Sequence, residues 1–428
     1  MPASFKPRPL LEDLRSLPRS YWVLVGGTFI NRFGTFVMPF LIIFLWKQGH
    51  TLTEASFAVS AFGVGALCGS TFGGWMADRI GRRNTIASGA FAAAVFYLLL
   101  YFARPMPLVI VCAILAGFSA SIYPPASSAL LVDVVPEERR VRAWAAWRVA
   151  VNAGFACGAA TAGFLAKVSF LALFVGDAIT TAAFGVIALT ALPHGLRVHR
   201  GQAPWPVALR HIRNNRAFLL NFGAVLCASL IFSQFGTAYS ADVVSLHLSL
   251  RIFGHELSGE TVYGLLIGWN GLLVMLAELP LTALTLRCEP RRTMAIGYLF
   301  LGGGFALNSV FHAFWTLFTA MTIFTFGEML SASTSNAYIA RLSPPHLRGR
   351  YMGVLSLAWC SSSVIGPPIG LSLLQHGYRF GWLLCGALGV IGAGLALASR
   401  PSEIYSASAD ADPTQSFEAE PLEGSALG

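Results

Sequence analysis

Charged residues are scarce in this chain. Asp, Glu, Lys and Arg together make up 11% of its 428 residues, whereas soluble domains contain about 25%. Hydrophobic residues account for 55%, and the mean hydropathy is +0.64. This composition is typical of a polytopic membrane protein. The net charge is +9, but Lys and Arg recur singly between apolar segments instead of gathering on one face, so we expect no nucleic-acid partner.

Catalytic and metal-binding signatures are also missing from the sequence. The seven cysteines are scattered as single residues, and six of them lie inside apolar runs, so their spacing predicts neither a metal site nor a disulfide framework. The nine histidines lie in predicted loops or near helix ends. There is no Walker loop and no Gly-x-Ser-x-Gly elbow. We therefore expect no enzyme activity, no catalytic residues and no bound metal.

Apolar runs of the length needed to cross a bilayer, about twenty residues, recur along the chain. The first is expected to be a retained spanning helix, because charged residues and proline interrupt the segment before it and leave no cleavable signal. The runs predict an all-α membrane protein with twelve transmembrane helices. Their expected bounds are 20–46, 54–76, 84–103, 107–132, 142–166, 168–192, 217–243, 260–286, 293–312, 314–340, 351–375 and 379–399.

The positions of the 29 Lys and Arg residues predict the orientation. Most of them fall in the N-terminal tail and in alternate connecting segments, which places these segments and both termini in the cytoplasm. The longest basic connector separates six helices from six. The predicted organisation is a cytoplasmic N-terminal tail (1–19), an N-terminal six-helix bundle (20–192), a basic cytoplasmic linker (193–216), a C-terminal six-helix bundle (217–400) and an acidic, disordered cytoplasmic tail (401–428).

The two halves share a residue pattern at an offset of 208 residues. Parallel repeats of six helices are typical of transporters whose halves rock about a site near the membrane midplane. We therefore predict two six-helix pseudo-repeat bundles. The matching residues are Pro136, Arg140, Arg142 and Gly158 in the first half and Pro344, Arg348, Arg350 and Gly366 in the second.

A charged loop at residues 74–83 joins the second and third predicted helices. Asp78 can pair with a neighbouring arginine or lie at the N-terminus of another helix, where the helix dipole favours an anion. Gly81 is expected to supply a backbone geometry that other residues avoid. Small residues four apart on the preceding helix let a neighbouring helix approach closely and slide: Gly65, Gly69 and Gly73. The alternative is that the arginines only fix the topology.

The pattern Gly74-x-x-x-Asp78-Arg79-x-Gly81-Arg82-Arg83 resembles the signature of loop 2–3 in the major facilitator superfamily. With twelve helices in six plus six, the resemblance covers essentially the whole chain. It implies that Asp78 contacts the start of helix 11, near Tyr351, and latches the cytoplasmic side closed. The expected gating residues are Gly74, Asp78, Arg79, Gly81, Arg82 and Arg83, together with Arg148 and Glu278.

Other stretches resemble the drug:proton antiporter branch of that family. They are Asn31-Arg32, Arg148-x-x-x-Asn152-x-Gly154, Gln234, Asn270, Glu278-Leu279-Pro280, Phe326-Gly327-Glu328 and Arg348-Gly349-Arg350. The chain departs from the antiporter pattern at Ala159, where helix 5 normally has proline, and at Ala113, where many antiporters have an arginine. The resemblance implies proton-coupled efflux, with an importer or a specific metabolite exporter of the same fold as the alternative.

Charged side chains within a span are costly, so each is a candidate functional residue. Glu328, near the middle of its helix, is the strongest candidate for proton coupling, because desolvation favours the neutral form of its carboxyl group. The alternative for Glu328 is a structural hydrogen bond to Ser331, Ser333 or a neighbouring helix. Arg32 needs an anionic partner, which could be Glu328 or an anionic substrate.

Three more charges lie within predicted spans. Arg148 could form a gate pair with Asp133 or Glu137, or contact substrate. Glu278, beside a proline near a helix end, is expected to form a helix-packing or gating pair. Asp177 is expected to have a structural role.

Aromatic and amide residues at helix centres are expected to line the substrate site, since ligand pockets are mostly apolar with a few placed polar groups. The mixture favours a lipophilic or amphipathic solute over a sugar. We therefore expect a monomeric plasma-membrane transporter, in a bacterial inner membrane, that uses the proton gradient and no cofactor; a non-transporting receptor is the alternative. The expected substrate-binding residues are Asn31, Arg32, Phe36, Tyr123, Asn152, Gln234, Tyr239, Trp269, Asn270, Tyr338 and Trp359.

Overall fold

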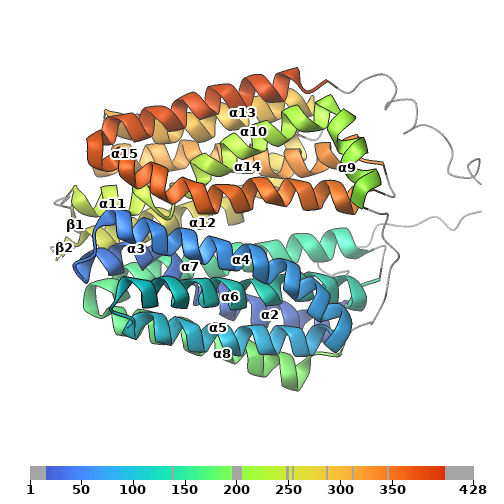
Figure 1. Cartoon of the computed structure of the whole chain (residues 1–428), viewed down its shortest axis with the longest axis horizontal. Helices are drawn as coiled ribbons and strands as arrows, with labels where there is room; N and C mark the ends of the chain where they lie inside the picture. Colours follow the sequence, from blue (N-terminus) through green and yellow to red (C-terminus); the bar gives the residue numbers. More distant parts are fainter. Residues whose placement is uncertain are drawn as a thin grey trace, which may run out of the picture.

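The computed structural model describes residues 16–136, 139–194, 205–246, 250–252, 255–285, 288–310, 313–344 and 347–400. Figure 1 shows two helical bundles lying side by side, with the N-terminal half below and the C-terminal half above. In the described part of the chain, ten helical segments are long and apolar enough to cross a membrane. Two further helices, α13 and α14, complete the twelve that were expected. The predicted fold class is therefore confirmed.

The bounds of the helices follow the predicted runs closely. The N-terminal bundle contains α2 (Arg19–Phe33), α3 (Val37–Lys47), α4 (Leu52–Ile80), α5 (Arg82–Phe102), α6 (Met106–Val134), α7 (Arg140–Val168) and α8 (Phe170–Ala191). The C-terminal half contains α9 (Trp205–Asn214) in the linker, α10 (Arg216–Ser233), α11 (Ala238–Ser245), α12 (Gly259–Thr285), α13 (Pro290–Ala306), the 3-10 turn η2 (Leu307–Ser309), α14 (Phe314–Leu342) and α15 (Arg348–Ala398). The last of these is two predicted helices separated at Gly377, where the backbone is not helical.

The two ends of the molecule are distinct. At one end, β1 (Leu250–Ile252) and β2 (His255–Leu257) form an antiparallel hairpin, which the all-helical expectation had not included. At the opposite end lies α9, in the segment that connects the bundles (Figure 1). We call these the hairpin end and the linker end. The charge distribution predicts that the linker end is cytoplasmic.

The first helix of each half is interrupted. The run expected at 20–46 is divided into α2 and α3, and the run expected at 217–243 into α10 and α11. The carboxylate of Asp177 on α8 accepts hydrogen bonds from the backbone N–H groups of Phe36 and Val37 at 3.1 and 2.9 Å, so it caps the start of α3. Thr181 donates to the same carboxylate at 3.2 Å. Asp177 therefore has the structural role that was expected of it.

Two glycines of the sequence repeat occupy equivalent places beside these interruptions. A Cβ at Gly158 of α7 would lie 2.1 Å from the carbonyl oxygen of Phe33, the last residue of α2. A Cβ at Gly366 of α15 would lie 1.9 Å from the hydroxyl of Ser233, the last residue of α10. Both positions exclude a side chain. The repeat in the sequence thus corresponds to a repeat in the packing.

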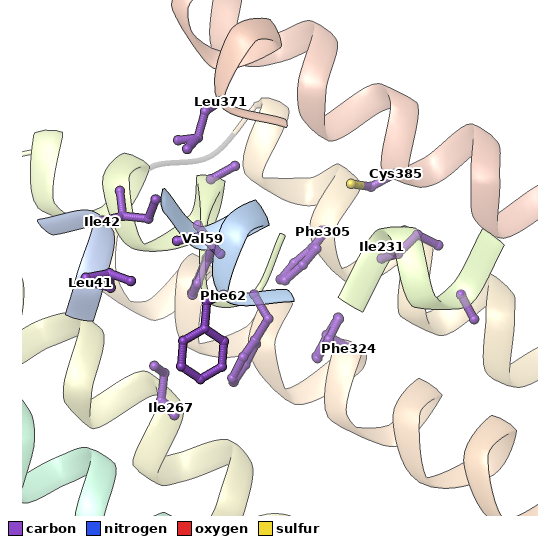
Figure 2. Packing of buried hydrophobic residues seen from close by; sticks show 14 of the residues in the cluster. Leu41, Ile42, Val59, Phe62, Ile231, Ile267, Phe305, Phe324, Leu371 and Cys385 are labelled. Carbon is purple, nitrogen blue, oxygen red and sulfur yellow. The ribbon is translucent and has the colours of Figure 1, made fainter. Parts of the chain in front are cut away.

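The buried apolar residues form one large cluster that includes both bundles. Figure 2 shows Leu41 of α3 and Phe62 of α4, which belong to the same cluster as Phe305 and Phe324 of the C-terminal half. The rings of Phe305 and Phe324 stack at 4.3 Å. A second cluster, which contains Tyr21 and Ala77, belongs to the N-terminal bundle alone and lies toward the linker end. The shared core therefore joins the bundles away from the linker end.

The glycine face of α4 packs inside its own bundle. Cβ atoms at Gly65, Gly69 and Gly73 would lie 2.0, 2.0 and 2.3 Å from carbonyl oxygens of α6. The neighbour that these glycines admit is therefore α6. The expected close approach of a neighbouring helix is therefore found within the N-terminal bundle, and sliding along this face stays a prediction.

Candidate functional site

A charged pair joins the two bundles, from the first third of α7 to the last third of α12. Arg148 of α7 forms an ion pair with Glu278 of α12. Asn152, one turn further along α7, donates to the other carboxylate oxygen of Glu278 at 3.4 Å. Glu278 is buried, with 7% of its surface exposed. A carboxylate of the C-terminal half is thus held by two side chains of the N-terminal half.

This pairing was not one of those considered for Arg148 from the sequence. Of the two partners expected, Asp133 lies beside Arg82, with its Oδ2 atom 3.4 Å from Arg82 Nε. Glu137 lies outside the described residues. Among the described residues, the ion-pair partner of Arg148 is Glu278, in agreement with the pair role that was expected for Glu278.

Glu328 lies on α14, beside this pair. Asn270 of α12 donates to Glu328 Oε2 at 2.9 Å and to Thr325 at 2.9 Å. Arg148 is close enough to Glu328 for the two charges to interact. We call Arg148, Asn152, Asn270, Glu278 and Glu328 the central polar cluster. It extends from α14 through α12 to α7 and so connects Glu328 with the boundary between the bundles.

The alternative for Glu328 is a structural hydrogen bond, and the structure shows which groups bond to its carboxylate. The hydroxyl of Ser331 donates to the backbone carbonyl oxygens of Gly327 and Glu328, at 2.7 and 3.3 Å. These are bonds within the helix and leave the Glu328 carboxylate to Asn270. The neighbouring helix, and not Ser331, therefore provides its hydrogen bond.

Arg32 belongs to a different group, inside the N-terminal bundle. Arg32 and Asp177 both lie close to the phenol groups of Tyr97 and Tyr123. Asn31 donates to Thr181 at 3.2 Å and accepts from Tyr123 at 3.1 Å. The expected alternative of an Arg32–Glu328 pair is therefore not the arrangement found, because Arg32 lies on the N-terminal side with Asp177. This places Asn31, Arg32 and Tyr123 together, apart from the central polar cluster.

The aromatic residues expected in the substrate site are divided. Trp359 of α15 is 43% exposed, and its ring meets Phe232 edge to face at 5.6 Å. It lines a cavity that also contains Glu328. Trp269 donates through Nε1 to Thr322 at 2.9 Å and lines a separate apolar pocket between α7, α12 and α14.

Four other expected substrate residues are engaged in packing. Phe36 is buried at the interruption of the first helix, and Tyr239 is fully buried against Phe305. Gln234 donates to the backbone carbonyl of Gly366 at 3.1 Å and so holds the interruption between α10 and α11. Tyr338 hydrogen bonds to the carbonyl of Ser399 at the linker end. Helix rotation and depth, which hydropathy does not fix, explain these differences.

The cavity beside Glu328 lies inside the C-terminal bundle, between α10, α13, α14 and α15. Most of its wall is apolar, with a few hydroxyl groups and one carboxyl group. We call it the C-bundle chamber. Its lining residues are Val225, Ala228, Phe232, Tyr298, Leu301, Glu328, Ser331, Ala332, Ser335, Leu355 and Trp359.

The charged loop between α4 and α5 is held within the N-terminal bundle. Arg82 Nη1 donates to Asp78 Oδ1 at 2.5 Å, and the backbone N–H of Arg82 donates to the carbonyl of His194 at 2.9 Å. Gly81 has a φ of +92°, the backbone geometry that was expected of it. The loop thus ties α4 and α5 to α6, through Asp133, and to the end of α8.

The remaining loop residues face outward. The guanidinium of Arg79 lies over the ring of Trp75 at 5.2 Å, and Arg83 donates to Asn84 at 3.4 Å. A Cβ at Gly74 would meet nothing within 4 Å. These positions leave room around the loop for a neighbouring helix.

The bundles meet at the hairpin end. Lys47 forms an ion pair with Glu260, Thr53 donates to Gln375 at 3.2 Å, and Ser60 donates to the carbonyl of Val364 at 2.7 Å. Figure 1 shows α4 running away from the first half of α15 toward the linker end. There α4 exposes 52% of Trp75. The polar contacts that the structure describes between α3 or α4 and the C-terminal half therefore lie at the hairpin end.

With the bundles joined at the hairpin end, Asp78 pairs within its own bundle. The expected contact of Asp78 with the start of helix 11 requires the linker end to close. In the described part of the chain, Asp78 pairs with Arg82, while Tyr351 packs against Phe218 at 4.6 Å and bonds with His211 at 2.7 Å. The latch therefore remains a prediction for the opposite state.

Sequence reasoning missed a buried acid in the seventh predicted helix. Asp242 on α11 is 3% exposed and accepts a hydrogen bond from Trp382 Nε1 at 3.0 Å. Asp242 lies inside the predicted run 217–243, and a charged residue within a span is by that fact a candidate functional residue. The pair of Lys47 and Glu260 was also missed, because both residues lie at the ends of predicted spans.

Comparisons with known proteins agree with this architecture. The family model described as Major Facilitator Superfamily matches residues 24–259 and 230–420. The Na(+), Li(+), K(+)/H(+) antiporter of Planococcus maritimus is 28% identical over 395 residues, which cover 86% of this chain and 92% of that protein. The quinolone resistance protein NorA of Staphylococcus aureus (strain MSSA476) is 27% identical over 231 residues, which cover 52% and 59%.

Solved structures show the same fold at low sequence identity. A POT family transporter in complex with 5-aminolevulinic acid has a TM-score of 0.74 and 17% identity, covering 89% of this chain and 95% of that one. A mutant of the nucleoside transporter NupG has a TM-score of 0.73 and 14% identity, covering 89% and 100%. Both comparisons show that this chain shares its fold with these transporters.

Proposed function

Because this chain belongs to the major facilitator superfamily, we propose that it exports a small lipophilic or amphipathic solute in exchange for protons. The chain is an integral membrane transporter of that family and not an enzyme. Our proposal adds the direction of transport, the coupling ion and the class of solute to this family assignment. We place it in the plasma membrane with the linker end in the cytoplasm, as the distribution of Lys and Arg predicts.

The position of Glu328 carries the proposal. Its carboxylate is held by Asn270 and lies near the ion pair of Arg148 with Glu278, which joins the bundles. When Glu328 is ionised, Arg148 is attracted by two carboxylates of the C-terminal half. Protonation of Glu328 removes one of these attractions, and in a medium of low dielectric constant such a change is large. The protonation state of Glu328 would thus alter the force between the bundles that rock during transport.

The class of solute is inferred from the wall of the site. Phe232 and Trp359 present aromatic surface beside Glu328, and the remaining lining residues are mainly aliphatic. Such a wall favours a lipophilic solute with a polar or cationic group. The relative named as a quinolone resistance protein supports the same class.

A second candidate is exchange of a monovalent cation for protons. It is favoured by the antiporter of Planococcus maritimus, whose similarity extends over most of this chain. Glu278 and Glu328 would supply oxygen ligands, which hard cations prefer. Import, or export of one specific metabolite, is the alternative for the direction of transport.

Transport in inside-out membrane vesicles tests the proposal. We would follow proton movement with a pH-sensitive dye while adding lipophilic cations, quinolones, NaCl or KCl. We expect lipophilic compounds to release protons in the wild type, and Glu328→Gln to abolish that release. Glu54→Gln, which changes an acid at the start of α4 whose side chain is 43% exposed, is the matched control. Unchanged proton release in Glu328→Gln would assign the coupling to another residue, and a response to salts alone would favour the cation antiporter.

A further inference from the structure

Several polar groups of the C-bundle chamber are buried without a protein partner. In the described part of the chain, the hydroxyls of Tyr298 and Ser335 form no hydrogen bond, although Tyr298 is 2% and Ser335 5% exposed. The two hydroxyls lie near each other but do not meet hydrogen-bond geometry. Buried polar groups in folded proteins nearly always have a protein or water partner. A water in the chamber that bonds to these hydroxyls would satisfy them.

The chamber has room for that water. It offers about 60 Å³ of space for water-sized molecules, several times the roughly 10–15 Å³ that one buried water requires. The carboxyl group of Glu328 lies at the same wall as Ser331 and Ser335. A water in the chamber would thus find the two or more polar partners that make its burial favourable.

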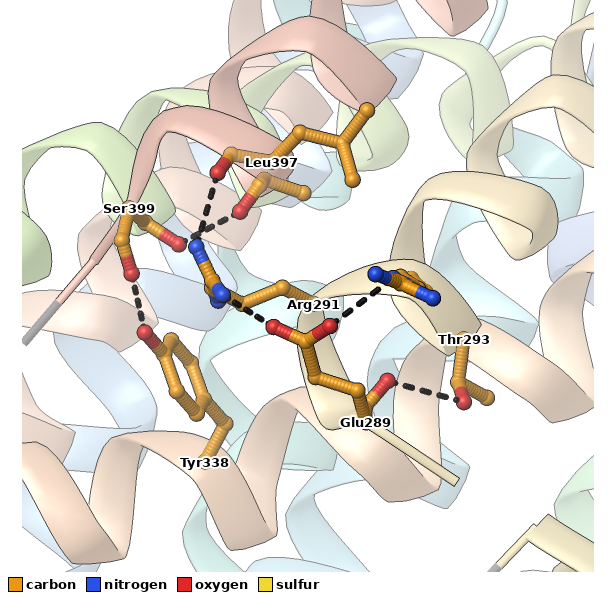
Figure 3. Close-up of polar contacts among 8 residues, drawn as sticks. Glu289, Arg291, Thr293, Tyr338, Leu397 and Ser399 are labelled. Carbon is orange, nitrogen blue, oxygen red and sulfur yellow. Dashed lines mark hydrogen bonds and ion pairs between the residues drawn. The ribbon is translucent and has the colours of Figure 1, made fainter.

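The polar groups continue from Glu328 toward the linker end along one face of α14. Ser331, Ser335 and Tyr338 follow Glu328 at steps of three or four residues, so they form a stripe about 15 Å long. At the end of the stripe, Tyr338 bonds to Ser399, and Arg291 donates to Leu397 and pairs with Glu289 (Figure 3). The side chain of Glu289 is 35% exposed. The stripe therefore begins at Glu328 inside the C-terminal bundle and ends near Glu289 at the linker end.

A second orphaned group lies beside the route. Asn221 of α10 is fully buried, and neither its amide nitrogen nor its amide oxygen has a partner in the part of the chain that the structure describes. Asn221 lies one turn closer to the linker end than Val225, which lines the chamber, and on the same helix face. An unpartnered amide in this position is a further place for an ordered water.

We propose that the C-bundle chamber holds a chain of ordered waters that carries protons from Glu328 toward the linker end. The inference rests on the proposed coupling role of Glu328. A proton leaves the Glu328 carboxyl for the first water, each water and hydroxyl accepts one proton and passes another on, and one proton reaches the surface near Glu289. Glu328 remains as a carboxylate.

The test follows the carboxyl group of Glu328 directly and needs no solute. Full-length protein in liposomes is subjected to a pH jump, and time-resolved infrared spectroscopy records the loss of the protonated carboxyl band, which Glu328→Gln identifies. We expect the double variant Tyr298→Phe, Ser335→Ala to slow the deprotonation of Glu328 about tenfold, because these hydroxyls position the waters of the chain. Ser335→Thr keeps the hydroxyl and should restore the rate.

Matched controls remove the same groups elsewhere. Tyr101→Phe lies in the N-terminal bundle, and Ser309→Ala lies at the hairpin end; both should leave the rate unchanged. Equal rates in the wild type and the double variant would overturn the chamber route while leaving Glu328 as the coupling residue. A band that persists in Glu328→Gln would instead overturn the coupling role itself. If the double variant does not fold, the comparison of Ser335→Ala with Ser335→Thr decides the question.

Discussion

Arg148 of α7 and Glu278 of α12 form an ion pair across the two bundles, and the two side chains differ in their access to solvent. The side chain of Arg148 is 48% exposed, whereas that of Glu278 is 9% exposed. A buried charge that loses its partner is strongly destabilised, while an exposed one is solvated by water. Removing Arg148 and removing Glu278 should therefore lower the stability of the protein by different amounts.

Arg148→Gln should destabilise the protein more than Glu278→Gln. The first change leaves the Glu278 carboxylate buried with only the weak hydrogen bond from Asn152, at a cost of about 3 kcal/mol. The second leaves an arginine that can turn toward water. Thermal unfolding in detergent should show the lower midpoint for Arg148→Gln. Lys167→Gln, an exposed charge at the other end of α7, is the control, and equal midpoints for the two pair variants would contradict the argument.

Asp78→Asn should lower the transport rate and leave solute affinity near the wild-type value. The substitution weakens the pair with Arg82 in the state described here, and it also removes the charge that would meet the N-terminus of helix 11 when the linker end closes. Binding and initial transport rates would be measured on the same reconstituted protein, with Glu54→Gln as a control acid on the same helix. Full activity of Asp78→Asn would favour a loop that only fixes topology.

Gly81→Ala should destabilise the protein more than Gly74→Ala, although both glycines belong to the same motif. Gly81 has a φ of +92° and a ψ of 156°, a region open almost only to glycine, so alanine should cost about 1–3 kcal/mol. A Cβ at Gly74 meets nothing within 4 Å, and there alanine should be neutral or slightly stabilising. Thermal unfolding midpoints of the two variants check this order. The reverse order would show that the loop geometry differs from the one described.

Asp177→Leu should destabilise the first helix, whereas Asp177→Asn should have little effect. Leucine leaves the backbone N–H groups of Phe36 and Val37 buried without acceptors, which costs about 1–3 kcal/mol for each group. Asparagine keeps an oxygen at the same place. Thermal unfolding would compare the two variants, and a large loss of stability in Asp177→Asn would mean that the charge itself is required.

The apolar runs predicted the helices well for a physical reason. Backbone groups in a bilayer must be bonded within the helix, so long apolar stretches leave few other structures. The interruptions after Phe33 and Ser233 were not predicted, although Gly34, Thr35, Gly236 and Thr237 lie at them, because glycine is also frequent inside spanning helices. Their cause is distant in sequence, in Asp177 and Gly366, and only the folded chain brings these residues together.

The candidate site was predicted in part, and the differences follow from rotation about the helix axis. Glu278 and Arg148 were selected for their charge at depth, and the structure pairs them. Gln234 and Tyr239 were selected as polar or aromatic residues at helix centres, but both point into their own bundle. A charge within a span requires a partner, whereas an amide or a ring is also satisfied by packing.

Thr53 and Gln375 offer a test of the rocking motion itself. Their side chains meet at 3.2 Å across the hairpin end, so cysteines at the two positions should be joined by a short thiol-reactive cross-linker in this state. A cross-link there holds the hairpin end closed, and transport, which requires that end to open, should stop and recover on reduction of a cleavable linker. Each single cysteine variant, treated with the same reagent, controls for the exposed native Cys68, Cys157 and Cys288. Transport that continues in the cross-linked double variant would mean that the hairpin end does not open during the cycle.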